Sequence, residues 1–215
     1  MNTGAVDLQS IIGGLGGGFA VVDGSSSATH LSDAVASIGD TNGDGLGDVA
    51  FSPFASYSDP QQIDRVYVVF GRSTPEPLDI TQLESGIGGF AINGFQSGDR
   101  FGSVISAAGD DNTDGFMDFA IGAPNFQDNS RSNYNGGAIA VVHGSSSPAT
   151  VLEASLINDQ PPLGKIWVGE DSGNYAGRAI ADGGDVNGDG FTDITIGAPR
   201  YGYGTGSGLR EPVRN

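Results

Sequence analysis

The sequence predicts an all-β protein built from propeller-type blades of four antiparallel strands. Short apolar runs alternate with turns rich in glycine, which accounts for 37 of the 215 residues, and this pattern is typical of antiparallel sheets. An acidic nonapeptide recurs at 40–48, 110–118 and 185–193, which we call loops 1, 2 and 3. Because each repeat is apolar on both faces, it should stack on copies of itself, and a radial stack of sheets is a propeller.

Each repeat contains the same segments in the same order. Strand A precedes the acidic loop and strand B follows it, as in "FGSVISAAGD" at 101–110 and "FAIGAP" at 119–124. In strand B, Phe119 and Ile121 alternate with Ala120, which is the period of a strand. Proline then ends the run because it cannot donate a hydrogen bond to a neighbouring strand. Similar segments flank the other two loops.

Strands C and D complete each repeat. Strand C is a strongly apolar run at 65–71 and again at 138–144, so both of its faces should be covered. Strand D lies at 89–94 and 164–169 and leads into the next repeat, and a similar segment at 18–24 precedes the first acidic loop. No segment has a helical period long enough to predict a helix.

These repeats divide the chain into units of approximately 1–71, 72–144 and 145–215. The last unit has strands A and B but no apolar strand C. Because propellers typically have about 4–8 blades, we expect about three incomplete blades that do not close into a ring on their own. The strand edge at 193–198 should then be unpaired or pair with another chain.

Composition restricts the classes of function. The 26 acidic and 9 basic residues give a formal net charge of −17, which disfavours nucleic acid and anionic membranes as partners. There is no cysteine and therefore no disulfide. No apolar stretch approaches the ~20 residues of a transmembrane helix, and the first ten residues do not have the pattern of a signal peptide.

All three acidic loops read D-x-N-x-D-G-x-x-D, and this pattern predicts calcium sites. Calcium takes ~6–8 oxygen ligands, and a tight turn can direct side-chain oxygens from positions 1, 3 and 5 to one centre. Position 7 offers its carbonyl, position 9 closes the site, and glycine at position 6 permits the bend. The expected ligands are Asp40, Asn42, Asp44, the Leu46 carbonyl and Asp48 in loop 1; Asp110, Asn112, Asp114, the Phe116 carbonyl and Asp118 in loop 2; and Asp185, Asn187, Asp189, the Phe191 carbonyl and Asp193 in loop 3. We therefore expect about three structural Ca²⁺ ions.

Other readings of the acidic loops are less consistent with the pattern. An EF-hand needs a bidentate glutamate at position 12, where this chain has Phe51, Ile121 and Ile196. Magnesium requires strict octahedral geometry, and zinc or copper would call for cysteine or clustered histidine. An Asx-rich turn without metal explains one or two acids, but not the same four side-chain positions in three loops. Asp111 lies between ligand positions and should point outward.

Phe101-Gly102 and Gly122-Ala123-Pro124 bracket loop 2. This arrangement resembles the FG-GAP repeat of the integrin alpha-chain β-propeller family and its bacterial relatives. The third unit keeps Gly197-Ala198-Pro199 but has Ala176-Gly177 in place of FG. The first unit has "LS" and "SPF" at the two places, although its acidic loop is intact.

The resemblance implies a seven-bladed propeller, calcium in the hairpin loops between strands A and B, and a secreted or cell-surface location. It implies a role in extracellular recognition or cell adhesion. We expect no enzyme activity, because the acids outside the loops form no recurrent acid/base pair and the serine-rich turns have no partner base. Two alternatives stay open. One is a non-catalytic propeller domain of an extracellular carbohydrate-active or lipid-active enzyme, and the other is a structural spacer of a large surface protein.

Five of the six tyrosines fall on one side of the predicted disc. Successive antiparallel connections alternate between the two ends of a sheet, so the A–B loops lie on one face and the B–C and D–A segments on the other. The tyrosines in these latter segments are Tyr57, Tyr134, Tyr175, Tyr201 and Tyr203. Tyrosine is enriched at interfaces, so we expect a protein or glycan ligand on this face. The alternative is that the rings only pack loops onto blades.

Overall fold

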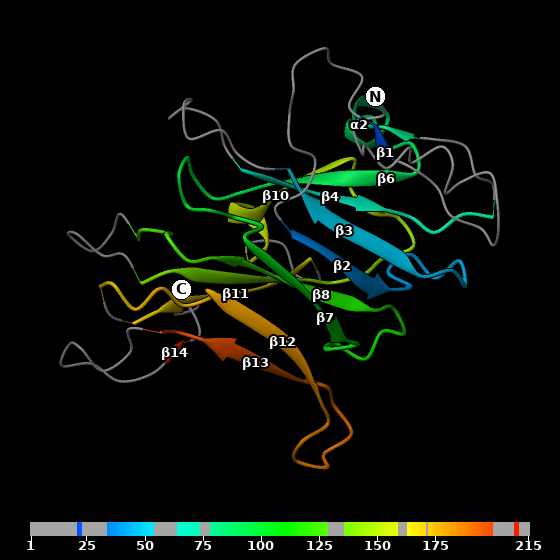
Figure 1. The fold of residues 1–215 in the computed structure, drawn as a ribbon. Coiled ribbons are helices and arrows are strands. Elements are labelled where there is room, and N and C mark those ends of the chain that lie inside the picture. The colour runs from blue at the N-terminus through cyan, green and yellow to red at the C-terminus, as the bar shows by residue number, and fades with distance from the viewer. Residues whose placement is uncertain are drawn as a thin grey trace, which may run out of the picture.

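The computed structural model describes residues 34–53, 64–73, 78–128, 136–158, 163–170 and 172–199, together with the backbone of 21–22 and 209–210. Nearly all regular structure in this part is β-strand, which confirms the predicted fold class. Figure 1 shows the strands as stacked, twisted sheets that do not close into a ring, as expected for partial propeller blades. No helix in the described part is long and apolar enough to cross a membrane.

Blade 1 is a four-stranded antiparallel sheet with a fifth strand at its edge. β2 (Ala34–Gly39) pairs with β3 (Asp48–Ser52), β3 with β4 (Arg65–Val69), and β4 with β6 (Gly89–Asn93). These are strands A to D in the predicted order. β10 (Val151–Glu153) then joins β6 in parallel and forms the edge of the sheet.

Blade 2 repeats this arrangement. β7 (Val104–Gly109), β8 (Asp118–Ala123), β9 (Ala138–Val142) and β11 (Gly164–Gly169) pair antiparallel in that order. β14 (Leu209–Arg210) lies antiparallel at the β11 edge. Both sheets therefore run across the predicted unit boundaries at 71 and 144, because each takes strand D from beyond the boundary. The division into units stays a prediction.

Blade 3 is represented in the described residues by one hairpin. β12 (Ala179–Gly184) pairs antiparallel with β13 (Asp193–Gly197), and within the described part β13 has no second neighbour. A further short pair lies before blade 1 in the stack. There, β1 (Val21–Val22) pairs in parallel with β5 (Leu78–Asp79).

Two short helices follow the parallel edge strands, and the sequence analysis did not predict them. α2 (Ile80–Glu84) has five residues, and the 3₁₀ helix η1 (Ala154–Leu156) has three, so neither is long enough to show a period. The signal that was available is a capping box: the Asp79 side chain accepts the Thr81 amide, and the Gln82 side chain accepts the Asp79 amide.

The C–D connections link each blade to the one before it. After strand C, the chain of blade 1 forms β5 and α2, and that of blade 2 forms β10 and η1. In both cases the short strand lies parallel to strand D of the preceding repeat, β5 on β1 and β10 on β6. The side-chain amide of Asn93 also donates to the Glu153 carboxylate at 2.6 Å. Neighbouring blades are therefore joined by main-chain hydrogen bonds as well as by side-chain packing.

The hydrophobic core lies between the blades. Ile38, Val68 and Ile92 of blade 1 pack with Phe119 and Ile121 of blade 2 in the largest cluster. A second cluster joins blade 2 to blade 3. Strand C is buried along Val66–Val69 in blade 1 and along its whole length in blade 2, as its apolar sequence predicts. Each fully buried side chain of this kind contributes roughly 1.5–3 kcal/mol.

A buried aspartate shapes the turn that leads into strand A of blade 2. Oδ2 of Asp99 accepts the amides of Phe95 and Gln96, each at 2.9 Å, and Oδ1 accepts the amide of Phe101 at 2.8 Å. Burial raises the pKa of Asp99 to about 6, against the opposing effect of these amide donors. The side chain thus holds the Phe101-Gly102 pair in place at the start of the blade.

The same turn recurs at the start of blade 3. Asn174 stands where blade 2 has Asp99 and is also buried. The next residue adopts a left-handed backbone in both copies, with φ of 59° at Arg100 and 55° at Tyr175. The conformation of Tyr175 therefore belongs to the repeated turn.

Candidate metal centres

The three acidic loops join strands A and B and lie at the same end of their sheets, at the right and bottom of Figure 1. Each loop follows a break in strand register, between Ser37 and Gly39 in blade 1 and at the matching places in blades 2 and 3. The glycine at each break has a positive φ. Such a bulge bends the strand and redirects the chain, so every loop leaves its blade in the same way.

The acidic side chains of loop 1 turn back onto the backbone of their own loop. The Asp40 carboxylate accepts the amides of 43–45 at 2.7–3.1 Å. Asn42 Oδ1 accepts the amide of Asp44 at 2.9 Å, and Asp44 Oδ1 accepts the amide of Leu46 at 2.8 Å. Positions 1, 3 and 5 therefore all direct oxygen atoms into the turn.

Loops 2 and 3 repeat this pattern. In both, the carboxylate at position 1 accepts the backbone amides of positions 5 and 6. The side-chain oxygen of the asparagine at position 3 accepts the backbone amide of position 5. The carboxylate at position 5 accepts the backbone amide of position 7. These are Asx-type turns. The three loops therefore share one arrangement of side-chain oxygens around the same turn.

The oxygen donors of the loops fit a calcium ion in kind and in charge. A carboxylate has about four acceptor sites, so the hydrogen bonds leave acceptor capacity at positions 1 and 5. Among the described residues, the ion pairs do not involve a carboxylate at either position. Within the part of the chain that the structure describes, two negative charges per loop are thus without a protein cation, in a set of hard oxygen ligands of the kind that calcium prefers.

The aspartate at position 9 ties loop 1 to the end of strand C. Asp48 is fully buried. Its Oδ2 accepts the amide and the hydroxyl of Thr41, at 2.9 and 2.5 Å, and its Oδ1 accepts the amide of Gly71 at 2.8 Å. Burial raises the pKa of Asp48, with a smaller contribution in the same direction from the charge of Asp44.

Asp118 makes the corresponding connection in blade 2. It is also fully buried, and it accepts the amides of Asp111 at 2.8 Å and Gly144 at 2.9 Å. In loop 3, Asp193 is only partly buried and accepts the amide of Val186 at 2.9 Å. The loop pattern predicts a metal ligand at position 9 but does not indicate this structural role. A glycine after strand C in "VFG" and "VHG" was the available signal.

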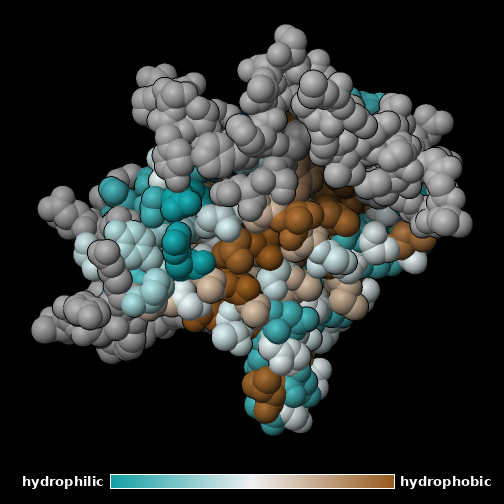
Figure 2. Space-filling model, in the orientation of Figure 1, coloured by the Kyte–Doolittle hydropathy of each residue, from teal (hydrophilic) through white to brown (hydrophobic). Residues whose placement is uncertain are grey.

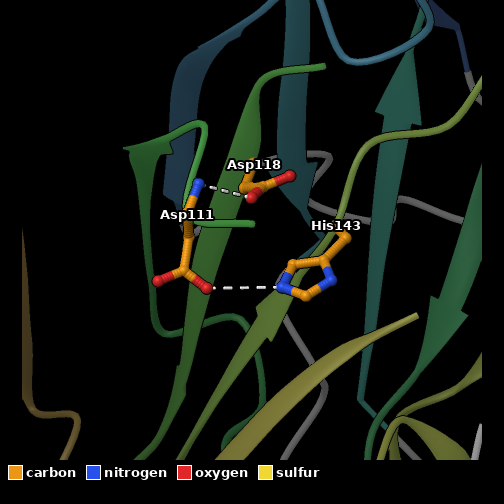
Figure 3. A group of neighbouring side chains, drawn as sticks. All are labelled: Asp111, Asp118 and His143. Carbon is orange, nitrogen blue, oxygen red and sulfur yellow. Dashed lines mark hydrogen bonds and ion pairs between the residues drawn. The ribbon is translucent and has the colours of Figure 1, made fainter. Parts of the chain in front are cut away.

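Asp111, at position 2 of loop 2, points away from the loop interior, as Figure 3 shows. Its Oδ2 lies 2.5 Å from Nζ of Lys165 and 3.3 Å from Nε2 of His143. The bond to His143, followed by Lys165, lowers the pKa of Asp111 to about 2, although burial opposes the shift. Nothing local in the sequence indicates that His143 meets loop 2, from which it is 32 residues distant.

Asp111, Asp118 and His143 form a group whose ligand atoms lie within 4.8 Å of one another. The ion pair with Lys165 favours a hydrogen-bonded network over a separate metal site there, because the ammonium already supplies positive charge to Asp111. The candidate metal centres are therefore the interiors of the acidic loops.

Most of the predicted tyrosine face lies outside the described residues, namely Tyr57, Tyr134, Tyr201 and Tyr203. Tyr175 is partly buried, in the D–A turn. The antiparallel order of the strands places that turn at the end of the sheet opposite to the acidic loops. Its role in binding stays a prediction.

Stacked four-stranded blades with acidic A–B loops define a repeat protein of the propeller class. Residues 176–209, which include loop 3, match the FG-GAP repeat family. Over 204 residues the chain is 29% identical to integrin alpha-PS5 of Drosophila melanogaster, covering 93% of this chain and 18% of the integrin. It is 36% identical over 117 residues to integrin alpha pat-2 of Caenorhabditis briggsae, covering 52% of this chain and 8% of that protein.

A third relative is a phospholipase and not an integrin. Over 162 residues the chain is 32% identical to phosphatidylinositol-glycan-specific phospholipase D of Mus musculus, covering 74% of this chain and 17% of the phospholipase. The chain thus spans less than a fifth of the length of these curated relatives. Together the matches support assignment of the chain, with partial coverage, to the FG-GAP, integrin alpha-like family, and so confirm the predicted resemblance.

Proposed function

We propose that this chain is a calcium-binding module of extracellular recognition or adhesion, with structural Ca²⁺ in its acidic loops. The observation that carries the proposal is the threefold recurrence of one loop, with the same oxygen atoms turned into the same turn. The similarity to integrin alpha chains supports an adhesion-type propeller module. An extracellular or cell-surface location follows from the same similarity.

Each calcium ion would be held by positions 1, 3, 5 and 9 and by the carbonyl of position 7. Calcium would supply positive charge where two carboxylates have no protein cation among the described residues, as at the partly buried Asp40 and the exposed Asp44 of loop 1. The protein residues do the rest: position 1 fixes the bend by accepting loop amides, and position 9 anchors the loop to its blade. The role of the metal is structural, because the side chains at positions 1, 3, 5 and 9 also accept the backbone amides that shape the hairpin.

A calorimetric titration tests the metal assignment. About three Ca²⁺ ions should bind per chain, with dissociation constants of ~10⁻⁶ to 10⁻³ M, the range of sensor and extracellular sites. Mg²⁺ should bind more weakly, because it demands octahedral geometry and retains its waters. Asp44→Asn, Asp114→Asn and Asp189→Asn should each remove one site. Absence of binding heat in the folded wild-type chain would contradict the proposal.

The partner is proposed to bind the face opposite to the calcium loops. We propose a protein or glycan ligand that contacts the tyrosines of the B–C segments, with Tyr175 at the edge of the same face. Changing Tyr57, Tyr134 and Tyr201 to alanine in the whole protein should reduce capture on an array of matrix proteins and glycans. An interface tyrosine can contribute ~2 kcal/mol or more, equivalent to about 30-fold in affinity.

The control for that experiment is the calcium side. Substitution of exposed residues between ligand positions, such as Thr113→Ala, should leave capture unchanged. Full capture by the tyrosine variant, with loss of capture by changes on the calcium side, would reverse the assignment of faces. A wild-type protein that captures nothing on the array would favour a structural spacer.

A second candidate function is that of a non-catalytic propeller domain in an extracellular lipid-active enzyme. The similarity to the mouse phospholipase favours it. Cleavage of glycosylphosphatidylinositol by the whole protein, with no activity in the isolated chain, would support this candidate over an adhesion module.

A further inference from the structure

We propose that loops 1 and 2 are a coupled pair, in which residues of blade 2 set the calcium affinity of loop 1. The inference rests on the proposed calcium function and adds a dependence between neighbouring sites. It is carried by contacts from loop 2, and from the segment after strand C of blade 2, onto the backbone of loop 1.

Two main-chain hydrogen bonds connect blade 2 to loop 1. The amide of Met117, at position 8 of loop 2, donates to the carbonyl of Asp40 at 3.0 Å. The amide of Ser145, just after strand C of blade 2, donates to the carbonyl of Thr41 at 2.8 Å. Positions 1 and 2 of loop 1 are thus held by the following blade. Position 1 is the residue whose carboxylate organises the whole turn.

Side chains of loop 2 also pack on bare backbone in loop 1. A Cβ atom added to Gly43, at position 4, would lie 2.6 Å from Cε1 of Phe116. One added to Gly39, just before the loop, would lie 2.7 Å from Cγ of Met117. Both glycines have positive φ, at 77° and 80°. Phe116 and Met117 therefore cover two glycines that hold left-handed backbone, one in loop 1 and one just before it.

Loops 2 and 3 lack the contact between a position-7 ring and a glycine at position 4 of the preceding loop. Thr113 stands where loop 1 has Gly43 and keeps the left-handed backbone, with φ of 60°. Phe191, the counterpart of Phe116, is 49% exposed, whereas Phe116 is more deeply buried. Thr192 still packs against Gly109. The chain thus contains its own comparison: the position-7 ring covers the preceding loop in one pair and is exposed in the other.

The physical effect is preorganisation. A loop that is already held in its bound conformation loses less conformational entropy when the ion binds. Loss of the Phe116 ring should leave the ligands of loop 2 intact, since that residue contributes only its carbonyl, but should loosen loop 1. Coupling between sites typically corresponds to about 5–150-fold in affinity, and we expect an effect near the lower end, about 5–20-fold.

The test isolates loop 1 by silencing the other two. In a chain carrying Asp114→Asn and Asp189→Asn, calorimetry with Ca²⁺ should report one site, in loop 1. Adding Phe116→Ala should weaken calcium binding at that site by about 5–20-fold. Phe116→Leu should give an affinity between those of the chains with phenylalanine and alanine at this position. The matched control keeps loop 2 by combining Asp44→Asn with Asp189→Asn. There, adding Phe191→Ala should leave the affinity within about 2-fold, because that ring is exposed.

A second measurement needs no substitution of Phe116. By linkage, Ca²⁺ bound to loop 1 should slow hydrogen exchange at the amides of Met117 and Ser145 in the chain whose loops 2 and 3 are silenced. Unchanged affinity after Phe116→Ala in a chain with native circular dichroism, or unchanged exchange at both amides, would overturn the coupling. Absence of Ca²⁺ binding in the wild type would instead refute the proposed function itself.

Discussion

Removal of calcium is expected to destabilise the chain more than any single substitution. An ion that binds only the folded state adds about 2.7 kcal/mol when its free concentration is 100 times the dissociation constant. Three such sites would add about 8 kcal/mol. The physical source is neutralisation: without the ion, the carboxylates at positions 1 and 5 of each loop face one another with no protein cation among the described ion pairs. Thermal unfolding in Ca²⁺ and in EDTA measures the difference.

Two variants of loop 2 distinguish metal binding from ordinary hydrogen bonding. Asp114→Ala should lose about 2.7 kcal/mol in calcium and much less in EDTA. Asp111→Ala removes contacts to Lys165 and His143, so its loss should be the same in both conditions. Equal melting temperatures of the wild type with and without calcium, or a loss for Asp114→Ala that does not depend on calcium, would rule out the ligand assignment.

Asp118→Ala is expected to destabilise the chain by about 2–4 kcal/mol even in EDTA. The substitution removes the acceptor of the part-buried Asp111 amide and of the buried Gly144 amide, and each unsatisfied buried group costs about 1–3 kcal/mol. Relief of the buried carboxylate offsets part of this loss, because burial raises the pKa of Asp118. Denaturant titration in EDTA gives the free energy of unfolding directly.

Asp193→Ala is the matched control for the connection at position 9. Asp193 occupies the same position of loop 3, but it is partly exposed and accepts one backbone amide at 2.9 Å and, at 3.4 Å, the side-chain amide of Asn187. Its loss in EDTA should be under about 1 kcal/mol, the net contribution of an ordinary hydrogen bond. Equal losses for the two variants would show that the link to strand C contributes nothing beyond the loop itself.

The strand order and the positions of the acidic loops could be predicted from the sequence because their signals are local. Alternation in Phe119–Ile121 identifies strand B, and the spacing of acids, asparagine and glycine identifies each loop. Repetition then shows that the segments belong to one type of blade. The predicted fold class is confirmed on these grounds.

The features that escaped prediction depend on partners far away in the chain. β5 and β10 have two and three residues, and their parallel partners lie in the preceding repeat, so no local period reveals them. Asp111 meets Lys165 across 54 residues of sequence. The buried role of position 9 likewise depends on where strand C ends, which the loop sequence alone does not contain.

The parallel edge strand has a consequence for the order in which the protein is synthesised and folded. Strand D of blade 1 pairs with β10, and the Asn93–Glu153 bond spans 60 residues. At translation rates of about 5–20 residues per second, the fourth strand would therefore wait roughly 3–12 s for its outer neighbour. During that interval its edge is open to pairing with other nascent chains, so a slow stretch of translation between the two strands would prolong the period in which the chain can misassemble.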